Sequence, residues 1–495
     1  MIKQTLIKPA IIMPALILVI LAGCGTSQDI LQAQPSSPVA LADGETYQLE
    51  ILPVLHTVNG RSLQMLGYNG QIPGPLLQVR QGARVMINVT SRIPYETTVH
   101  WHGIRLENKY DGVPGVTQQP ILLGESFLYV LDFPDEGIYW YHPHVREDMQ
   151  QELGLYGAIV VEPTEQLYRP AREIVLMIDD IALQGSGIVP FGAYATHTLM
   201  GRYGNVMLVN GNEQIDLDAK TGELLRLFLV NTANARPMNI AVVGKWMTLV
   251  GRDSRQEQDE VVSSIMLSPA ERAIVEVQFD APGSYQLVHQ TPERTYELGT
   301  IRVEGDGGQS LPAADALLQP SQSSFPPIDA AAPPDYTLDL TIDMSVMEPG
   351  MHMAMMGGMH GGVRPIEWED DMQAMNAQAT SRNIRWVIRD PLSGKENMNI
   401  HPVVSQGEFK RIRIVNTRSS MHPMQHPIHL HGQRFLVAAI DGKPVTNRAW
   451  RDTVLVPAGS TADLLVAFTN PGEWMLHCHI AEHLEAGMMM AFSVV

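Results

Sequence analysis

The sequence predicts an all-β protein with three Greek-key β-sandwich domains in one chain. Its 495 residues correspond to about three domains at roughly 150 residues each. Glycine (41) and proline (34) are frequent and charged residues make up only 18%, which is typical of turn-rich β domains and not of coiled coils or disordered chains. A strand unit that occurs three times along the chain supports the same number of domains.

The repeated unit begins with a polar turn and continues as alternating apolar residues, the two-residue period of a half-buried strand. Its three copies are residues 79–89, 221–231 and 406–416. Each copy is followed by a second turn-and-strand segment, and these segments are residues 133–142, 279–289 and 468–477. One β unit is therefore used three times, and short strands joined by Gly and Pro turns favour Greek-key sandwiches.

The repeat and two linker-like stretches, at 163–170 and 307–335, set the domain boundaries. We expect domain 1 over 45–165, domain 2 over 166–306, a linker over 307–335, and domain 3 over 336–495 with a methionine-rich insertion at 344–375. The middle copy lacks the histidine-rich runs of the outer copies, so we expect domain 2 to be scaffold.

The N-terminus has the layout of an export signal. Residues 1–23 carry two lysines and then an apolar run that is too short to span a bilayer comfortably. The run ends in Leu-Ala-Gly-Cys, which resembles the bacterial lipobox whose cysteine is lipidated. We expect cleavage before Cys24, a tether over 24–44, and an exported protein of the cell envelope or periplasm, anchored by lipid to a bacterial membrane. An ordinary secretory signal with a chance cysteine is the alternative.

The charge balance argues against one class of partner. Acidic residues outnumber basic ones by 53 to 34, for a formal net charge of −19, which disfavours binding to nucleic acid. The chain has two cysteines, Cys24 and Cys478. A disulfide between them is possible but would remove the first from the lipobox and the second from a histidine-rich motif.

Ten of the 17 histidines fall into four short clusters. Alternate residues of a strand share a face, so each cluster presents two imidazoles to one side. The pairs are His100/His102, His142/His144, His429/His431 and His477/His479. Pairs of this kind at matching positions of the outer repeats, and absent from the middle one, predict a metal site with eight nitrogen donors and not a set of structural histidines.

A second site follows from the same parity. His426 and Cys478 are out of step with the paired histidines and face the other way. With His483, and Met488 as a weak axial donor, they form the trigonal set with a long thioether that is typical of blue electron-transfer copper. Zinc prefers four strong ligands. Because Cys478 is bonded to a paired histidine on each side, an electron at its sulfur has a through-bond route to the eight-histidine site.

These motifs resemble those of the multicopper oxidases, over essentially all of residues 45–495. In that family three cupredoxin domains hold one mononuclear blue copper and a trinuclear cluster between the first and last domains. Four one-electron oxidations of a substrate reduce O₂ to two waters. The resemblance therefore implies four copper ions as cofactors and O₂ as the acceptor, and we expect a monomer.

The resemblance also assigns each ligand to a type of copper. The mononuclear type 1 ion takes His426, Cys478, His483 and Met488. The type 2 ion takes His100 and His429, and the type 3 pair takes His102, His142, His144, His431, His477 and His479.

Residues near the ligands suggest further roles. Asp111 stands where family members carry an acid that is thought to supply protons to the cluster; a turn aspartate before glycine is the alternative. Glu482 and Glu485 flank His483 and either orient it, accept a cationic substrate, or are solvated surface acids. Met488, where some relatives have a non-coordinating residue, implies a lower-to-middling redox potential.

A methionine-rich tract just before the third copper motif bears on the reductant. Its thioethers are Met344, Met347, Met351, Met353, Met355, Met356 and Met359. Soft thioethers select Cu(I), and glycines within the tract argue against the alternative, a buried helical stripe. Copper-tolerance oxidases of bacterial periplasms carry a similar insertion. Met424 matches a substrate-copper ligand of that group, whereas His422 stands where the group has an aspartate. We also expect a short helix within 360–385, covering the mononuclear site.

Three functions remain open at this point. The first is a cuprous oxidase that converts Cu(I) to Cu(II) in copper tolerance, with phenols as side substrates. The second is a general laccase whose methionine tract only recruits copper, and the third is a non-enzymatic copper-binding envelope protein. None of the eleven strong ligands is missing, which disfavours the third, and we expect the first.

Overall fold

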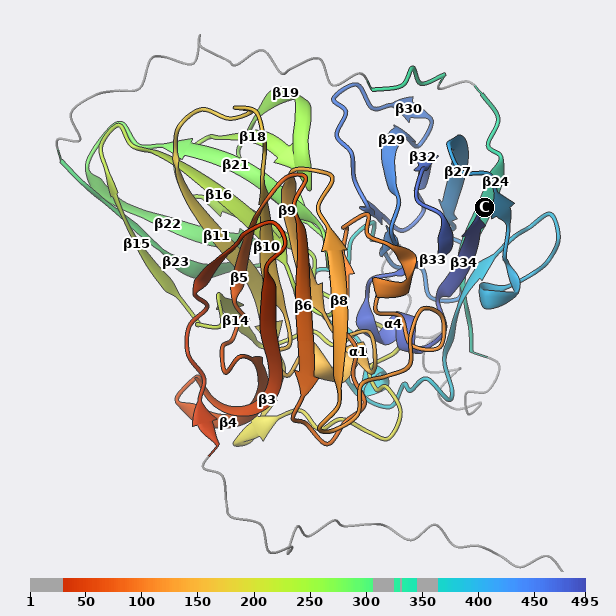
Figure 1. The fold of residues 1–495 in the computed structure, drawn as a ribbon, viewed down its shortest axis with the longest axis horizontal. Helices are drawn as coiled ribbons and strands as arrows, with labels where there is room; N and C mark the ends of the chain where they lie inside the picture. The colour runs from red at the N-terminus through yellow and green to blue at the C-terminus, as the bar shows by residue number, and fades with distance from the viewer. Residues whose placement is uncertain (1–29, 306–324, 330–331, 345–363) are drawn as a thin grey trace, which may run out of the picture. The chain divides into compact units, whose positions relative to one another are not determined.

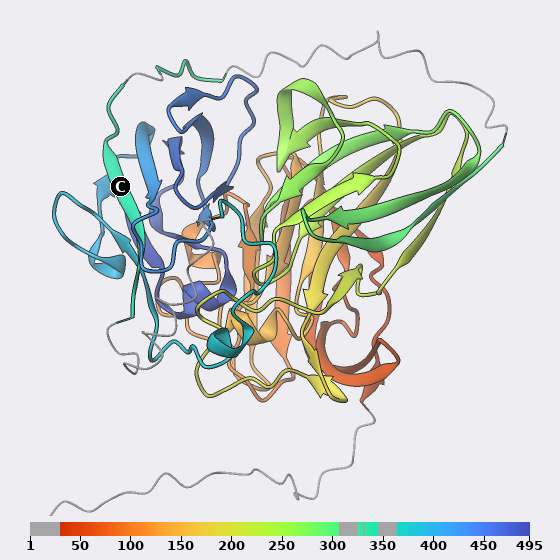
Figure 2. The ribbon, with the colours of Figure 1, turned by 180° about the vertical axis from the view of Figure 1, so that it is seen from behind.

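Strands account for almost all regular structure in the computed structural model, which describes residues 30–305, 325–329, 332–344 and 364–495. They form three successive sandwiches of two sheets each (Figures 1 and 2). The predicted signal peptide, Cys24 and most of the predicted linker lie outside the described residues. Within the described part of the chain no helix has the length and apolar character needed to span a bilayer.

The first sandwich has two five-stranded sheets. One sheet contains β1 (Leu31–Gln32), β3 (Thr46–Val58), β4 (Arg61–Tyr68), β6 (Arg84–Ser91) and β8 (Ser126–Asp132). The other contains β2 (Pro38–Leu41), β5 (Leu76–Arg80), β7 (His100–His102), β9 (Gly137–His142) and β10 (Gly157–Glu162). Residues 31–41, which we expected in the tether, instead supply β1 and β2, because Leu41 is buried in the core and both strands pair with a longer neighbour.

The middle sandwich has a six-stranded and a five-stranded sheet, with a small hairpin of β12 (Leu183–Gln184) and β13 (Gly187–Ile188) beside them. The larger sheet contains β11 (Arg172–Ile181), β14 (Val206–Val209), β16 (Leu224–Asn231), β18 (Met247–Arg252), β19 (Ser254–Val262) and β21 (Arg272–Gln278). The smaller contains β15 (Ile215–Lys220), β17 (Met238–Val242), β20 (Ile265–Leu267), β22 (Gly283–Gln290) and β23 (Thr295–Glu304).

The third sandwich has the same composition of sheets. Its six-stranded sheet contains β24 (Tyr336–Asp343), β25 (Arg385–Arg389), β27 (Glu408–Asn416), β29 (Arg434–Ile440), β30 (Lys443–Pro444) and β32 (Thr461–Phe468). Its five-stranded sheet contains β26 (Val403–Val404), β28 (His426–Leu430), β31 (Thr453–Val456), β33 (Gly472–Cys478) and β34 (Met489–Val494).

Short helical turns connect the strands. They are η1 (Asn108–Tyr110), α1 (Glu147–Gln150), α3 (Gln373–Asn376), η2 (Asn397–Asn399) and α4 (Ala481–Glu485). The helix α3 falls within the range 360–385, where we expected a short helix. Contacts join α1 to α4, so the turn after β9 of the first sandwich packs on the turn after β33 of the third.

The same strand pairing recurs in each sandwich. In one sheet of each sandwich a central strand has a parallel neighbour on one side and an antiparallel neighbour on the other. The parallel pairs are β3/β6, β11/β16 and β24/β27. The antiparallel pairs are β6/β8, β16/β21 and β27/β32. The facing sheet of each sandwich also has one equivalent strand between two partners. The parallel pairs are β10/β5, β23/β15 and β34/β26. The antiparallel pairs are β10/β9, β23/β22 and β34/β33. The repeat segments fall on equivalent strands, which confirms the prediction of one β unit used three times.

The first and third sandwiches share a hydrophobic core, and the middle sandwich has a separate one. Buried residues of the first and third sandwiches, such as Trp101 and Trp386, belong to one continuous cluster, whereas the middle sandwich has its own cluster around residues such as Leu227 and Val275. Packing between the first and third sandwiches brings β7 and β9 close to β28 and β33. These four strands carry five of the paired histidines, and the other three, His144, His431 and His479, lie just after the ends of β9, β28 and β33.

Candidate metal centres

Strand register places the clustered histidines opposite one another. The antiparallel pairs β7/β9 and β28/β33 align equivalent positions, and the opposed residues are His100/His142 and His429/His477. The equivalent pair in the middle sandwich, on β17 and β22, aligns Ile240 with His289. The middle copy therefore keeps one histidine but not its partner.

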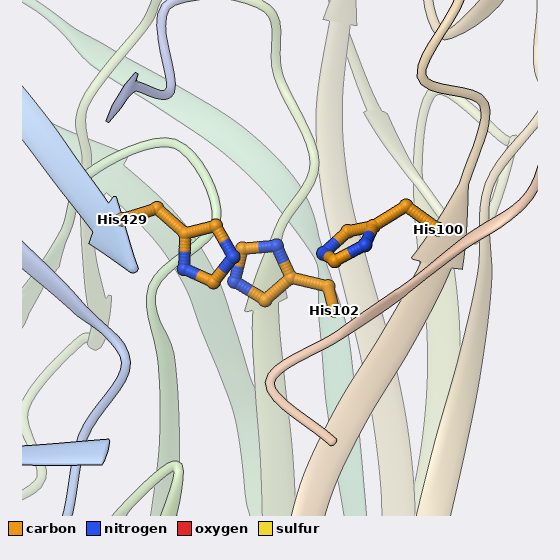
Figure 3. Close-up of side chains that lie close together, drawn as sticks. All are labelled: His100, His102 and His429. Atoms are coloured by element: carbon orange, nitrogen blue, oxygen red, sulfur yellow. The ribbon is translucent and has the colours of Figure 1, made fainter. Parts of the chain in front are cut away.

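Eight buried histidines come together between the first and third sandwiches. They form overlapping groups of three whose ligand nitrogens all lie within 4.8 Å of one another: His100/His102/His429, His102/His142/His479 and His144/His431/His477. Figure 3 shows the first group, in which His429 from β28 faces His100 and His102 from β7. Because each group draws on both sandwiches, the site exists only where these domains meet.

Hydrogen bonds leave ring nitrogens of these histidines free to bind a metal. In five of the rings Nδ1 lies 2.8 to 3.0 Å from a carbonyl or carboxylate oxygen: His100, His142, His429, His431 and His477. Among the described residues, Nε2 is buried with no hydrogen-bond partner in His100, His142, His144, His429 and His479. A buried nitrogen without a partner is costly, and it is the donor that copper binds.

Burial also sets the protonation state of these rings. Desolvation lowers the pKa of seven of them, with neighbouring imidazoles adding to the effect: His102, His142, His144, His429, His431, His477 and His479. A neutral imidazole is the form that coordinates metal. These rings are therefore ready to bind at neutral pH without first losing a proton.

A second site lies within the third sandwich. The Sγ atom of Cys478 is 3.5 Å from Nδ1 of His426 and 3.7 Å from Nδ1 of His483. Met488 is buried, and its carbonyl accepts a hydrogen bond from the Cys478 N–H at 3.1 Å. Burial lowers the pKa of His426 to about 3 and raises the pKa of the Cys478 thiol. One sulfur and two imidazoles that converge beside a thioether residue match the donor set of a blue copper site.

Comparison with known proteins identifies the family. Family models described as "Multicopper oxidase" match residues 54–166, 181–306 and 367–495. The chain is 30% identical over 467 residues to "Multicopper oxidase MmcO" of Mycobacterium tuberculosis, across 88% of this chain and 84% of that protein. The chain belongs to the multicopper oxidase family.

Other relatives of this multicopper oxidase carry different names. It is 29% identical to "Laccase" of Neurospora crassa, over 86% of this chain and 73% of that protein. It is 25% identical to "Copper resistance protein A homolog" of Pseudomonas syringae pv. tomato, over 92% of this chain and 93% of that protein. Among solved structures, the multi-copper oxidase from Pseudomonas thermotolerans superposes with a TM-score of 0.69 at 26% identity, over 92% of this chain and 100% of that chain.

The clusters of this multicopper oxidase fit four copper ions, one of type 1, one of type 2 and a type 3 pair. The structure divides the six histidines expected at the type 3 pair into two trios, His102/His142/His479 and His144/His431/His477. His100 and His429 remain for the type 2 ion, as the family resemblance implied. The structure therefore brings together every histidine and cysteine that we predicted as a ligand.

Asp111 lies directly against the cluster. Its side chain is buried, and Oδ2 accepts a hydrogen bond from Nδ1 of His431 at 2.8 Å. Its backbone carbonyl accepts one from Nδ1 of His100, also at 2.8 Å. Asp111 therefore orients one type 2 ligand and one type 3 ligand, and its role as a proton source stays a prediction.

The two acids that flank His483 occupy different environments. Glu482 is fully buried and accepts a hydrogen bond from Nδ2 of Asn234 at 3.0 Å, so it is not a solvated surface acid. Glu485 accepts a hydrogen bond from the backbone N–H of Glu147 at 3.2 Å. Neither bond involves His483, so these contacts do not support a role in orienting it.

Sequence reasoning missed residues that contact the ligands. Oδ1 of Asp452 accepts a hydrogen bond from Nε2 of His102 at 2.9 Å. Glu147 is fully buried, neither of its carboxylate oxygens is hydrogen-bonded to a described residue, and it lies 3.5 Å from Nδ1 of His479. No motif surrounds Asp452. Glu147 lies only three residues after His144, which is a local signal, but Asp148 beside it offers a second acid at the same place.

Most of the methionine tract falls in a part of the chain that the structure does not describe. Met347, Met351, Met353, Met355, Met356 and Met359 lie outside the described residues. Met344 follows β24 and is buried in the core that also contains Met424, and Met372 and Met375 pack against the same core.

Proposed function

We propose that this multicopper oxidase oxidises Cu(I) to Cu(II) with O₂ in copper tolerance. A contact between a thioether and an imidazole next to the type 1 ligands carries the proposal. Nε2 of His422 lies 3.0 Å from Sδ of Met200, and both side chains are buried. Met424, also buried, lies between His422 and His426 in the chain. Thioethers together with an imidazole form a donor set that prefers Cu(I).

One indole connects this donor set to the type 1 ligands. The ring of Trp386 stacks on His483 with centroids 4.2 Å apart, and it lies 4.8 Å from the ring of His426 and 6.2 Å from that of His422. A Cu(I) ion held by His422 and Met200 therefore lies within a few side chains of the type 1 site. Short separations of this kind suit one-electron transfer from the substrate ion.

The backbone around Cys478 provides a covalent route for electrons from the type 1 site to both histidine trios of the type 3 pair. Copper held by these residues would supply one-electron redox chemistry, with O₂ as the four-electron acceptor. Cys478 is covalently linked to His477 and His479, which belong to different histidine trios. Overall, four Cu(I) each lose one electron, and O₂ gains four electrons and four protons to give two waters.

The relatives support two substrates. A protein named for copper resistance covers this chain almost end to end, which favours Cu(I). A laccase matches at similar identity, which favours the alternative, a phenol oxidase whose methionine tract only recruits copper.

O₂ uptake by the copper-loaded enzyme separates these functions. The substrates are a stabilised Cu(I) complex and, separately, dimethoxyphenol, and the variants are Met200→Leu and His422→Gln. We expect Cu(I) oxidation to fall about tenfold or more, since loss of even an outer partner of a metal ligand costs 10 to 100-fold, while phenol oxidation holds. Met207→Leu, at a buried methionine of the middle sandwich, is the matched control. If neither variant changes Cu(I) oxidation relative to phenol oxidation, the protein is a laccase.

A deletion tests the tract itself. Residues 345–360 are removed while Met344 is kept, because its side chain is part of the core. Selective loss of Cu(I) oxidation makes the tract a collector of cuprous ions, and an unchanged rate shows that the donor set acts without it.

We also propose export and lipid anchoring at Cys24. The apolar run and the lipobox-like residues before Cys24 support this proposal. Fractionation of cells that express the wild type and Cys24→Ala tests it. We expect the wild type in the membrane fraction and the variant released from it, and a variant that stays membrane-bound contradicts the anchor.

A further inference from the structure

An arginine of the middle sandwich bonds to an aspartate that contacts the histidine cluster, although none of the predicted ligands belongs to that sandwich. Arg272 is the first residue of β21 and is fully buried. Its guanidinium donates two hydrogen bonds to the third sandwich, from Nη1 to Oδ1 and from Nη2 to Oδ2 of Asp452, at 2.7 and 2.6 Å. Its Nε donates to the carbonyl of Ile138 in the first sandwich at 3.0 Å. One side chain therefore bridges all three sandwiches.

Asp452 in turn contacts two of the predicted copper ligands. Its Oδ1 accepts a hydrogen bond from Nε2 of His102, and its backbone carbonyl lies 3.0 Å from Nδ1 of His429. Because a guanidinium stays charged and holds a carboxylate at two points, Arg272 keeps Asp452 in a fixed orientation. The oxygen that faces His102 is thereby held in place.

As a result, the imidazole of His102 uses the opposite nitrogen for its hydrogen bond from five other rings of the cluster. In His100, His142, His429, His431 and His477 it is Nδ1 that lies within hydrogen-bond distance of an oxygen. In His102 the bonded nitrogen is Nε2, and Nδ1 is buried with no partner among the described residues. The nitrogen that His102 offers to a copper ion is therefore Nδ1, because Nε2 is occupied by Oδ1 of Asp452 and by Oγ1 of Thr453, 3.1 Å away. The Thr453 hydroxyl in turn donates a hydrogen bond to Oδ1 of Asp452.

Gly103 shows how closely this arrangement is built. It follows His102 with φ of +86°, in the left-handed region that glycine favours. A Cβ atom there would come within 2.4 Å of Oδ2 of Asp452 and 2.7 Å of Nη2 of Arg272. The backbone just after β7 thus lies directly against the Arg272–Asp452 pair, with no room for a side chain at Gly103.

We propose that Arg272 is a positioning residue for the trinuclear cluster, which acts through Asp452 to hold His102 with Nδ1 toward the type 3 copper. The middle sandwich is then part of the copper machinery and not scaffold alone. The proposal does not depend on which substrate the enzyme oxidises.

The test compares Arg272→Met and Arg272→Lys with wild type in the full-length, copper-loaded protein. The measurements are copper per chain during titration with a chelator, the electron paramagnetic resonance signal of type 2 copper, the near-ultraviolet absorption of the type 3 pair, and the blue absorption of type 1. We expect Arg272→Met to hold cluster copper about 10 to 100-fold more weakly, as loss of an outer partner does, with the blue absorption unchanged. Lysine offers one contact point in place of two, so Arg272→Lys should be intermediate.

Arg226→Met is the matched control. Arg226 is also a buried arginine of the middle sandwich, but it bonds to Glu276 and Glu173. We expect its variant to keep wild-type copper signals. Wild-type cluster signals in Arg272→Met overturn the proposal, as does an equal loss of type 1 and cluster signals, which indicates general destabilisation. If Arg272→Met does not fold, Arg272→Lys decides: selective weakening of the cluster supports the proposal, and no change overturns it.

Discussion

The two copper sites differ in how many parts of the chain have to meet. The type 1 donors His426, Cys478 and His483 belong to one sandwich and lie on β28, β33 and α4. The trinuclear cluster draws histidines from the first and third sandwiches, and Arg272 of the middle one contacts it through Asp452. The type 1 site is thus a property of one domain, whereas the cluster is a property of the assembled chain.

This difference links metal binding to different structural events. Copper at the type 1 site stabilises a domain that already holds its ligands together. Copper at the cluster also joins two domains, so its binding free energy adds to their association. Changes at the type 1 site should therefore alter electron supply and leave the assembly intact, while changes at the cluster should alter both.

The largest effect is expected from Cys478→Ser. The variant loses the only sulfur that connects the type 1 site to His477 and His479, so blue absorption and O₂ consumption should both vanish. The cluster histidines are untouched, so we expect a folded protein that still binds copper at the cluster. Absorption spectra, O₂ uptake and metal analysis check this, and measurable turnover would show that electrons reach the cluster by another route.

Asp111→Asn tests the cluster side. The amide keeps the shape of the carboxylate but loses the charge next to His431 and His100. We expect kcat to fall about 10 to 100-fold with blue absorption unchanged. Steady-state O₂ uptake is the measurement, and Asp132→Asn, at a surface ion pair with Arg84, is the control. A normal rate would show that Asp111 contributes only shape.

Copper removal should separate the sites by stability. We expect the copper-free protein to unfold at a temperature several degrees lower, because saturating copper contributes about 4 kcal/mol when its concentration is 1,000 times the Kd. Cys478→Ser, which keeps only the cluster, should recover most of this stability when copper is added back. Thermal unfolding followed by circular dichroism checks the result. No recovery in that variant would mean that the cluster does not tie the domains together.

The smallest effect is expected from Met488→Leu. The three strong type 1 donors remain, so the blue absorption should persist. Loss of the axial thioether should raise the type 1 potential and change the rate of Cu(I) oxidation only a few-fold. Redox titration provides the measurement, and Met490→Leu, at a buried position on β34, is the control. An unchanged potential would mean that Met488 does not act as an axial donor.

Sequence reasoning performed well where chemistry is local. Short His-x-His motifs on strands, with Cys478 out of step with its neighbours, were enough to sort the histidine and cysteine donors into two sites. The division of the type 3 histidines into two trios was not accessible, because it depends on how two sandwiches pack. For the same reason Asp452 was missed: it meets His102 from 350 positions away in the chain. The strands β1 and β2 were missed because they are short and take their stability from the longer strands beside them.

The core shared by the first and third sandwiches has a consequence for biosynthesis. The first sandwich leaves the ribosome with an apolar surface whose partner is encoded after the whole middle sandwich. At about 5 to 20 residues per second, the wait is on the order of tens of seconds. Throughout that interval the nascent chain exposes residues that the finished protein buries, so it needs protection from aggregation until its last domain is made.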